Sequence, residues 1–241
     1  KEHQLFETQG YEAFRDFQVR KKDEPLKPGV AFPFVKRFLG LNKLFPNQEP
    51  FRVVALSRNS PETARRFFNS CRHYQLPIHA GAFTSGQSTF PYISAFKVSL
   101  FLSANAVNVS QAIEAGLPGG LVLPNRMADD SDDDDPTLRI AFDFDGVLAD
   151  DESERCYQKE GLSAFSIVTS RGAPSEERLI TTLKSFGMSA AELFLLDGLD
   201  KGSILEAIRP HIFFDDQARN LEKMQAQIPS VLVPFGIHNE Q

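Results

Sequence analysis

The chain has 241 residues, of which 41% are hydrophobic and 24% charged, as in a globular protein with one large domain or two small ones. Its formal net charge of −6 argues against nucleic acid as the main partner, because a phosphate backbone favours a basic surface. No apolar run approaches the roughly 20 residues of a membrane helix, and no signal peptide is visible, so we expect no membrane partner. Two cysteines, Cys71 and Cys156, cannot build a secreted disulfide framework and predict reduced thiols in a cytoplasmic protein.

Short apolar runs recur along the chain and predict the buried strands of a mainly parallel sheet. In chain order they are VVAL, LFL, IAF, IVT, FLL, IFF and VLV. Amphipathic stretches lie between them and carry helix start signals, namely Ser60 before Pro61 and Pro174 before Ser175. Strands that alternate with helices at this spacing predict an α/β fold.

The two halves of the sequence resemble each other. FRVVALSRNSPETARR aligns with FSIVTSRGAPSEERL, so that Ser57 falls on Ser170, and AFKVSLFLSAN aligns with AIRPHIFFDDQ. We therefore expect two repeated halves at residues 1–126 and 138–241. The intervening residues 127–137 include the run DDSDDDD, which we interpret as a solvated acidic linker in preference to a metal site.

The second half is shorter than the first. The first 14 residues align with ESERCYQKEGLSAF, so that Phe14 falls on Phe165, and the stretch equivalent to 15–29 and the following helix then has no counterpart. We expect this stretch to be disordered and absent between Phe165 and Ser166, with a Cα separation well above the roughly 3.8 Å of a trans peptide somewhere from Gly161 to Ser166. The alternative is a true deletion.

The string IAFDFDGVLADDESE contains the most informative residues. Asp143 and Asp145 follow an apolar run, and ligands of parallel sheets bind beyond the carboxyl ends of the strands. Gly146 allows the backbone to turn there and to direct N–H groups at an anion. An ordinary turn explains the pair equally well when it is considered alone.

Other predicted strands also end in polar residues. Thr169 and Ser170 end one strand, Lys201 lies in a later polar turn, and Asp215 and Asp216 end a third strand. Each has a structural explanation as a cap, a surface charge or a turn. Together, in this order, they predict a site for phosphoryl transfer with a metal.

The order of these residues resembles that of the haloacid dehalogenase-like phosphatases. DFDGV resembles their first motif, Thr169 the second, Lys201 the third and the Asp215–Asp216 pair the fourth. The strings SRNSPETARRFFNSCRHYQLPIHAGAFTSGQSTFPYISAFKVSLFLSAN, IAFDFDGVLADDESE and IRPHIFFDD resemble the cytosolic 5′-nucleotidase I family, including its bacterial members, over nearly the whole chain. The resemblance implies a Rossmann-like, haloacid dehalogenase-like fold and the hydrolysis of nucleoside 5′-monophosphates with Mg²⁺.

The resemblance also implies a role for each residue. Asp143 is the expected nucleophile, Asp145 the general acid and base, and Lys201 the third catalytic residue. The expected substrate-binding residues are Thr169, Ser170 and Arg171. The expected Mg²⁺ ligands are Asp143, Asp145, Asp215 and Asp216.

The first half lacks these groups. The alignment places Ser103 and Ala104 at the positions of the last two carboxylates, and Thr89 at the position of Lys201. We therefore expect the first half to be catalytically degenerate.

Three functions remain open at this point. The first is hydrolysis of nucleoside monophosphates, and the second is the same chemistry on another small phosphate ester. The third is a non-enzymatic binding protein on a degenerate phosphatase fold, which the full set of motif residues disfavours. The oligomeric state is unknown.

Overall fold

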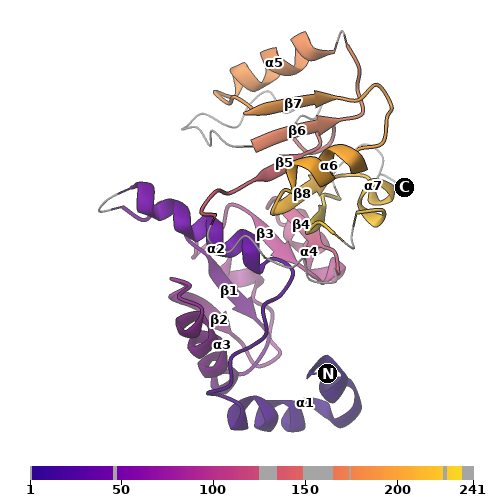
Figure 1. Cartoon of the computed structure of the whole chain (residues 1–241). Helices are drawn as coiled ribbons and strands as arrows, with labels where there is room; N and C mark the ends of the chain where they lie inside the picture. Colours follow the sequence, from indigo (N-terminus) through magenta and orange to yellow (C-terminus); the bar gives the residue numbers. More distant parts are fainter. Residues whose placement is uncertain are drawn as a thin grey trace. The chain divides into compact units, whose positions relative to one another are not determined.

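The computed structural model describes residues 2–45, 48–124, 135–148, 165–173, 175–224 and 227–234 (Figure 1). The chain forms two compact units. One consists of Lys1–Gly29 and Val35–Val98, and the other of Val30–Phe34 and Ser99–Gln241. Each unit is described by itself. None of the helices among the described residues is both long and apolar enough to span a bilayer.

The first unit is built on a small parallel sheet of two strands joined by a helix. Its elements are α1 (Glu2–Arg20), α2 (Phe32–Gly40, which crosses the division between the units), η1 (Leu41–Leu44), β1 (Val54–Ser57), α3 (Pro61–His73), β2 (Ala80–Phe83) and η2 (Phe90–Tyr92). The helix α1 is kinked at Gly10, whose φ of 81° suits glycine. As predicted, Ser60 is the N-cap of α3 and Pro61 is its first residue.

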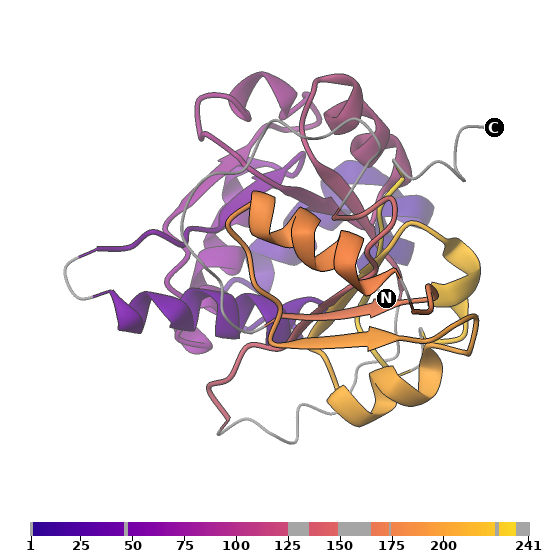
Figure 2. The same ribbon diagram turned by 90° about the horizontal axis from the view of Figure 1, so that it is seen from above.

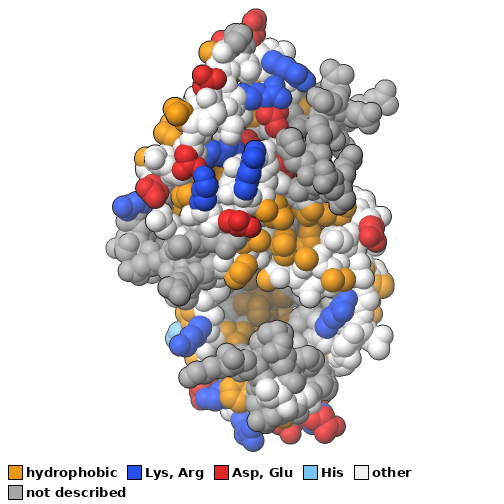
Figure 3. All heavy atoms as spheres, turned by 90° about the vertical axis from the view of Figure 1, so that its right-hand side faces the viewer, with side chains coloured by type: hydrophobic (Ala, Val, Ile, Leu, Met, Phe, Trp, Pro, Cys, Tyr) orange, Lys and Arg blue, Asp and Glu red, His pale blue; other side chains and the backbone are white. Residues whose placement is uncertain are grey.

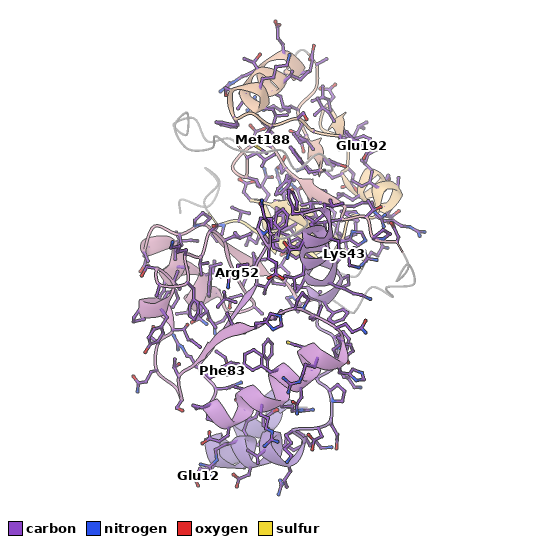
Figure 4. All side chains as sticks on the ribbon, turned by 90° about the vertical axis from the view of Figure 1, so that its left-hand side faces the viewer. Glu12, Lys43, Arg52, Phe83, Met188 and Glu192 are labelled. Carbon is purple, nitrogen blue, oxygen red and sulfur yellow. The ribbon has the colours of Figure 1, made fainter. Side chains whose placement is uncertain are left out.

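Polar and aromatic contacts hold α3 in this unit. Arg66 on α3 donates to the Oε1 of Gln18 on α1 at 2.9 Å, and both side chains are buried. The ring of Phe83 points from β2 toward α3 (Figure 4), where it contacts the rings of Phe67 and Phe68 at centroid distances of 6.0 and 5.9 Å. Edge-to-face packing at such distances is favourable for aromatic rings.

The second unit contains a mostly parallel sheet of seven strands. Its elements are β3 (Phe101–Ser103), α4 (Ala106–Glu114), β4 (Gly119–Val122), β5 (Ile140–Phe142), β6 (Phe165–Thr169), α5 (Glu176–Ser185), β7 (Glu192–Leu195), α6 (Gly202–Ile208), β8 (Ile212–Asp215), α7 (Ala218–Glu222) and β9 (Ser230–Leu232). The strand order is β3-β4-β9-β8-β5-β6-β7. The pair β4–β9 is antiparallel and the other pairs are parallel.

Helices cover both faces of this sheet. Figure 2 shows α5 on one side of β6 and β7 and α6 on the other. Alternation along β6 explains why: Ile167 packs with Leu179 of α5, whereas Val168 packs with Leu205 of α6. The sheet is therefore buried on both faces, as is usual for parallel strands.

The predicted α/β class with a mainly parallel sheet is confirmed, and each predicted apolar run contributes to a strand. Two strands, AGAF (β2) and GGLV (β4), were missed because their glycines weaken the strand pattern. The glycines reflect close packing: a Cβ on Gly81 would lie 2.8 Å from the Ala55 oxygen, and one on Gly120 would lie 2.4 Å from Val231 Cγ1.

The predicted break between Phe165 and Ser166 is wrong. The two residues are consecutive in β6, where Phe165 pairs with Ile140 and Ser166 with Ala141 of β5. A gap there would interrupt the register of both residues with the central strand. Residues 161–164, the rest of the predicted interval, lie outside the described residues.

The compact units do not coincide with the predicted halves at 1–126 and 138–241. The strands β3 and β4 belong to the seven-stranded sheet, because β4 pairs with β9 near the end of the chain. Most of the predicted linker, residues 127–134, lies outside the described residues. The only part described is its end, where Asp135 pairs with Arg139 at 2.6 Å.

The described surface carries both signs of charge. On the face shown in Figure 3, Lys and Arg side chains are interspersed with Asp and Glu side chains in the upper part of the view.

Candidate active site

The candidate site lies where three adjacent parallel strands end. The central strand β5 is paired with β8 on one side and with β6 on the other (Figure 1). Phe142, its last residue, lies opposite Phe214 and Ile167, so the next residues of the three strands are neighbours. The Asp143 N–H extends the ladder by donating to the Phe214 oxygen at 2.8 Å. The strand ends thus bring residues from distant parts of the sequence to one edge of the sheet.

A group of buried carboxylates occupies this edge. Asp143, Asp215 and Asp216 each offer an oxygen within 4.8 Å of the others, and all three are buried. Lys201, which is 4% exposed, lies at the start of α6 and places its Nζ 2.7 Å from Asp143 Oδ2 and 2.8 Å from Asp215 Oδ2. One ammonium therefore bridges two carboxylates that would otherwise repel each other.

Burial raises the pKa of Asp143 to about 6, although the nearby Lys201 ammonium lowers it. The other Asp143 oxygen, Oδ1, accepts a hydrogen bond of 2.7 Å from the Phe144 N–H. A carboxylate with a raised pKa beside a buried cation is a common feature of functional sites.

Asp215 is held by four hydrogen bonds. Its Oδ1 accepts from the Gln217 N–H at 2.8 Å and from Asn220 Nδ2 at 3.2 Å, and its Oδ2 accepts from Asn220 at 3.0 Å and from Lys201 at 2.8 Å. Asn220 was not among the residues predicted from the sequence. Its only signal was a donor side chain shortly after the Asp215–Asp216 pair, on a short helix. With both oxygens engaged, Asp215 orients Lys201 toward Asp143.

A second ion pair links the ends of β5 and β6. The Arg171 guanidinium donates from Nε to Asp145 Oδ2 at 2.6 Å and from Nη2 to Asp145 Oδ1 at 2.5 Å. The side chains of Arg171 and Asp145 are 35% and 41% exposed. The next residue, Gly146, has a φ of 72°, which glycine tolerates without strain. This fork-to-carboxylate arrangement is the strong form of an Arg–Asp contact.

Thr169 ends β6 and Ser170 begins the loop after it, and backbone hydrogen bonds hold both residues in place. Thr169 is 1% exposed, and its Oγ1 accepts from the Arg171 N–H at 3.2 Å, which leaves the hydroxyl proton free to donate elsewhere. The Ser170 side chain is exposed, and its carbonyl accepts from the Gly198 N–H at 2.8 Å.

The structure therefore joins the predicted residues in two groups. Asp143, Lys201, Asp215 and Asp216 form one group, and Asp145 with Arg171 forms the other. The Asp145 side chain is not part of the carboxylate group. The roles assigned from the sequence remain predictions.

Comparisons with known proteins identify the family of the chain. A family model described as 5′-nucleotidase matches residues 1–167 and 165–240. The chain is 30% identical to cytosolic 5′-nucleotidase 1B from Homo sapiens over 271 aligned positions, which cover 92% of this chain and 44% of the relative. The chain thus spans less than half the length of that relative. No solved structure matches.

These matches bear on the stretch that the second half lacks. The family match divides into two segments that meet at 165–167, and the alignment with the human relative, with 271 positions, is longer than this chain of 241 residues. The relative therefore has residues at aligned positions where this chain has none. The comparisons thus agree with the prediction that this sequence lacks a stretch that the relative has.

Proposed function

Because the chain belongs to the 5′-nucleotidase family, we propose that it hydrolyses nucleoside 5′-monophosphates to nucleosides and phosphate. The observation that carries the proposal is the Lys201 ammonium held between Asp143 and Asp215 at the carboxyl edge of a parallel sheet. The strand that carries Asp143 lies between those that carry Thr169 and Asp215, which supports the Rossmann-like arrangement of the haloacid dehalogenase-like phosphatases.

In the first step, an Asp143 oxygen attacks phosphorus and the bond from phosphorus to the ribose O5′ breaks. The product is an aspartyl-phosphate on Asp143 and a nucleoside. Asp145 donates a proton to the leaving O5′, which is a poor leaving group without one.

In the second step, water attacks the phosphorus of the aspartyl-phosphate. Asp145, now a carboxylate, accepts a proton from that water, and the bond from Asp143 to phosphorus breaks. Phosphate leaves, and both carboxylates return to their starting states.

The phosphate is bound by donors that the fold holds rigidly. Lys201 offers an ammonium with three protons, and the Thr169 hydroxyl retains a proton to donate. Both are buried, so their interactions with a developing negative charge are strong.

The carboxylate group fits a magnesium ion. Three buried carboxylates within 4.8 Å of one another form a set of hard oxygen ligands, of which Asp143 and Asp216 would hold the ion. Asp215 is a weaker candidate ligand, because its two oxygens accept four hydrogen bonds, whereas each Asp143 oxygen accepts one. A contact from the Asp145 backbone carbonyl stays a prediction. When bound, Mg²⁺ would offset the negative charge of the phosphate and of Asp143.

We further propose that the first part of the chain is a degenerate copy of the second. Asn59 N–H donates to Ser57 Oγ at 3.1 Å after β1, as Arg171 N–H donates to Thr169 Oγ1 at 3.2 Å after β6. Three backbone hydrogen bonds then link the β1 and β2 loops in the same pattern as the β6 and β7 loops. They run from Thr84, Ser85 and Gly86 to Ser57, Asn59 and Arg58, and from Leu196, Asp197 and Gly198 to Thr169, Arg171 and Ser170. These bonds match Ser57 with Thr169, one residue earlier than the sequence alignment did.

A second correspondence supports the same proposal. Asn105 N–H donates to Ser103 Oγ at 3.1 Å after β3, as Gln217 N–H donates to Asp215 Oδ1 at 2.8 Å after β8. Asn105 and Gln217 also share nearly the same backbone angles as helix caps. A serine in place of Asp215 keeps the turn but removes the carboxylate that orients a lysine, which explains a copy without catalysis.

A substrate screen tests the proposed function. Phosphate release would be measured from nucleoside 5′-monophosphates, nucleoside 3′-monophosphates and sugar phosphates, with Mg²⁺ and with a chelator. We expect the wild type to hydrolyse the 5′-monophosphates only with Mg²⁺, and we expect the Asp143→Asn variant not to hydrolyse them. Preference for a sugar phosphate would favour another small ester as substrate, and no hydrolysis of any ester would favour a non-enzymatic binding protein. The cytoplasmic location also stays a prediction, in keeping with the word cytosolic in the relative's name.

A further inference from the structure

The Arg171–Asp145 ion pair conflicts with the chemistry proposed for Asp145. Two guanidinium nitrogens bind the two Asp145 oxygens at 2.6 and 2.5 Å. An acid–base residue needs one oxygen free to exchange a proton with the leaving oxygen or with water. As long as both hydrogen bonds persist, the guanidinium engages one of the two lone pairs of each Asp145 oxygen, and neither oxygen is fully available to substrate.

The pair is placed so that it can open at small cost. Both side chains are more than one-third exposed, so water competes for these hydrogen bonds even though the fork is a strong contact. Lys201, in contrast, is buried between two carboxylates and has no such freedom. Of these two cations, Arg171 is therefore the one that can exchange its partner during a catalytic cycle.

Only the side chain of Arg171 needs to move. Its backbone N–H is bound to Thr169 Oγ1 at 3.2 Å, and its carbonyl accepts from the Asp197 N–H at 3.2 Å. The next residue, Gly172, lies so close to Asp197 that an added Cβ would be 2.5 Å from Asp197 Oδ1. The loop is thus fixed next to Thr169, a proposed phosphate ligand, while the guanidinium extends from it.

A phosphate group is the natural second partner for this guanidinium. Its oxygens accept the same pair of parallel N–H donors as a carboxylate does, and a dianion is the stronger acceptor. Phosphate bound beside Thr169 would therefore compete with Asp145 for Arg171.

We propose that Arg171 is a positioning residue that couples phosphate binding to the release of one Asp145 oxygen. The guanidinium holds Asp145 at the edge of the site and transfers one or both N–H donors to the substrate phosphate. The released Asp145 carboxylate then takes up a proton from water and donates it to the leaving O5′, so proton transfer takes place only when phosphate is present. The inference rests on the proposed function, because it requires Asp145 to act as the acid and base.

A double-mutant cycle tests this coupling. The four proteins are the wild type, Arg171→Gln, Asp145→Asn and the double variant, each assayed for kcat and KM with adenosine 5′-monophosphate and with p-nitrophenyl phosphate. Arg171→Gln is expected to raise KM and to lower kcat by about tenfold or more, part of the roughly 10²–10⁴ that general acid–base catalysis contributes. In the Asp145→Asn background, the same change should raise KM but alter kcat by less than about twofold.

Two further variants separate this role from a structural one. Arg171→Lys should recover part of the loss in KM but little of the loss in kcat, because an ammonium lacks the planar fork. Arg139→Gln removes a similarly exposed pair, with Asp135, at the opposite end of β5 and should change neither constant. An equal loss of kcat from Arg171→Gln in both Asp145 backgrounds would overturn the inference, as would a loss of similar size from Arg139→Gln.

The two substrates distinguish failure of this inference from failure of the proposed function. If the wild type hydrolyses only p-nitrophenyl phosphate, the substrate screen decides whether another nucleotide or another ester is the substrate. The cycle is then decided with p-nitrophenyl phosphate through the water-activation step. If the wild type hydrolyses the nucleotide but the cycle is additive in kcat, the function stands and the coupling through Arg171 is refuted.

Discussion

Replacing Asp143 with asparagine should stabilise the fold at neutral pH while it abolishes turnover. Burial raises the pKa of this carboxyl to about 6, so the folded protein tolerates the charge poorly despite the Lys201 contact. Asparagine is nearly isosteric, still accepts the Phe144 N–H and carries no charge. Residues that serve catalysis at the expense of stability commonly behave in this way.

The magnitude follows from the shift in pKa. The folded-state pKa is about 6 and the ordinary value is 3.8. At about 1.4 kcal/mol for each pKa unit, the ionised carboxylate costs the folded state about 3 kcal/mol. Between pH 4 and 6 the folded state binds more protons at this site than the unfolded state does. The stability of the wild type relative to the variant therefore falls as pH rises through that window and is constant above it.

Urea unfolding of both proteins in a metal-chelating buffer, from pH 4 to pH 8, measures this difference. The free energy of unfolding of Asp143→Asn minus that of the wild type should rise by about 3 kcal/mol and level off above pH 6 to 7. Asp143→Ser should show the same pH dependence from a different starting value, because serine does not titrate in this range either. A difference that is independent of pH, or that falls as pH rises, would refute the assignment of a buried, raised-pKa carboxyl.

Three further predictions concern the same edge of the sheet. Thr169→Ala should lower kcat by roughly 10² in a steady-state assay, the usual loss on removal of one donor to a developing charge. Ser57→Ala removes the matching hydrogen bond of the proposed first copy and should leave kcat within about twofold of the wild-type value. Asn220→Ala removes a donor to both oxygens of a buried carboxylate and should lower the free energy of unfolding by about 1–3 kcal/mol in urea titrations. Asn220→Asp adds a negative charge beside Asp215 and should lower the free energy of unfolding further. An unchanged free energy of unfolding in both variants would contradict the geometry. Added Mg²⁺ should raise the melting temperature of the wild type in a concentration-dependent way through binding to the folded state, and Asp216→Asn should largely remove this increase in a thermal-shift assay.

Local sequence patterns were sufficient for most of the strands. Apolar runs such as IAF and IFF are bounded by polar residues, and their alternation with amphipathic helices restricts the fold to the α/β class. The glycine-containing strands β2 and β4 escaped this reasoning. Their glycines are required by neighbours from other strands, such as Val231 against Gly120, and a local pattern does not contain that information.

The sequence and the hydrogen bonds give different registers for the proposed internal repeat. The sequence alignment matched Ser57 with Ser170, because both are serines before an arginine. The hydrogen bonds match Ser57 with Thr169, because each hydroxyl accepts from the N–H two residues later. Position relative to the strand end, rather than residue identity, determines which side chain occupies that turn.

The sequence by itself determined which chemical groups stand at the ends of the strands, because strand ends and helix starts are encoded by neighbouring residues. Only the tertiary structure decided which of these groups meet. The strand order puts β5 between β6 and β8, so that Asp143 shares Lys201 with Asp215, while Asp145 pairs with Arg171. Strand order depends on how helices pack over the whole sheet, which no local stretch of sequence encodes. The distances of 2.5 Å from Arg171 to Asp145 and of 2.8 Å from Lys201 to Asp215 follow from that packing.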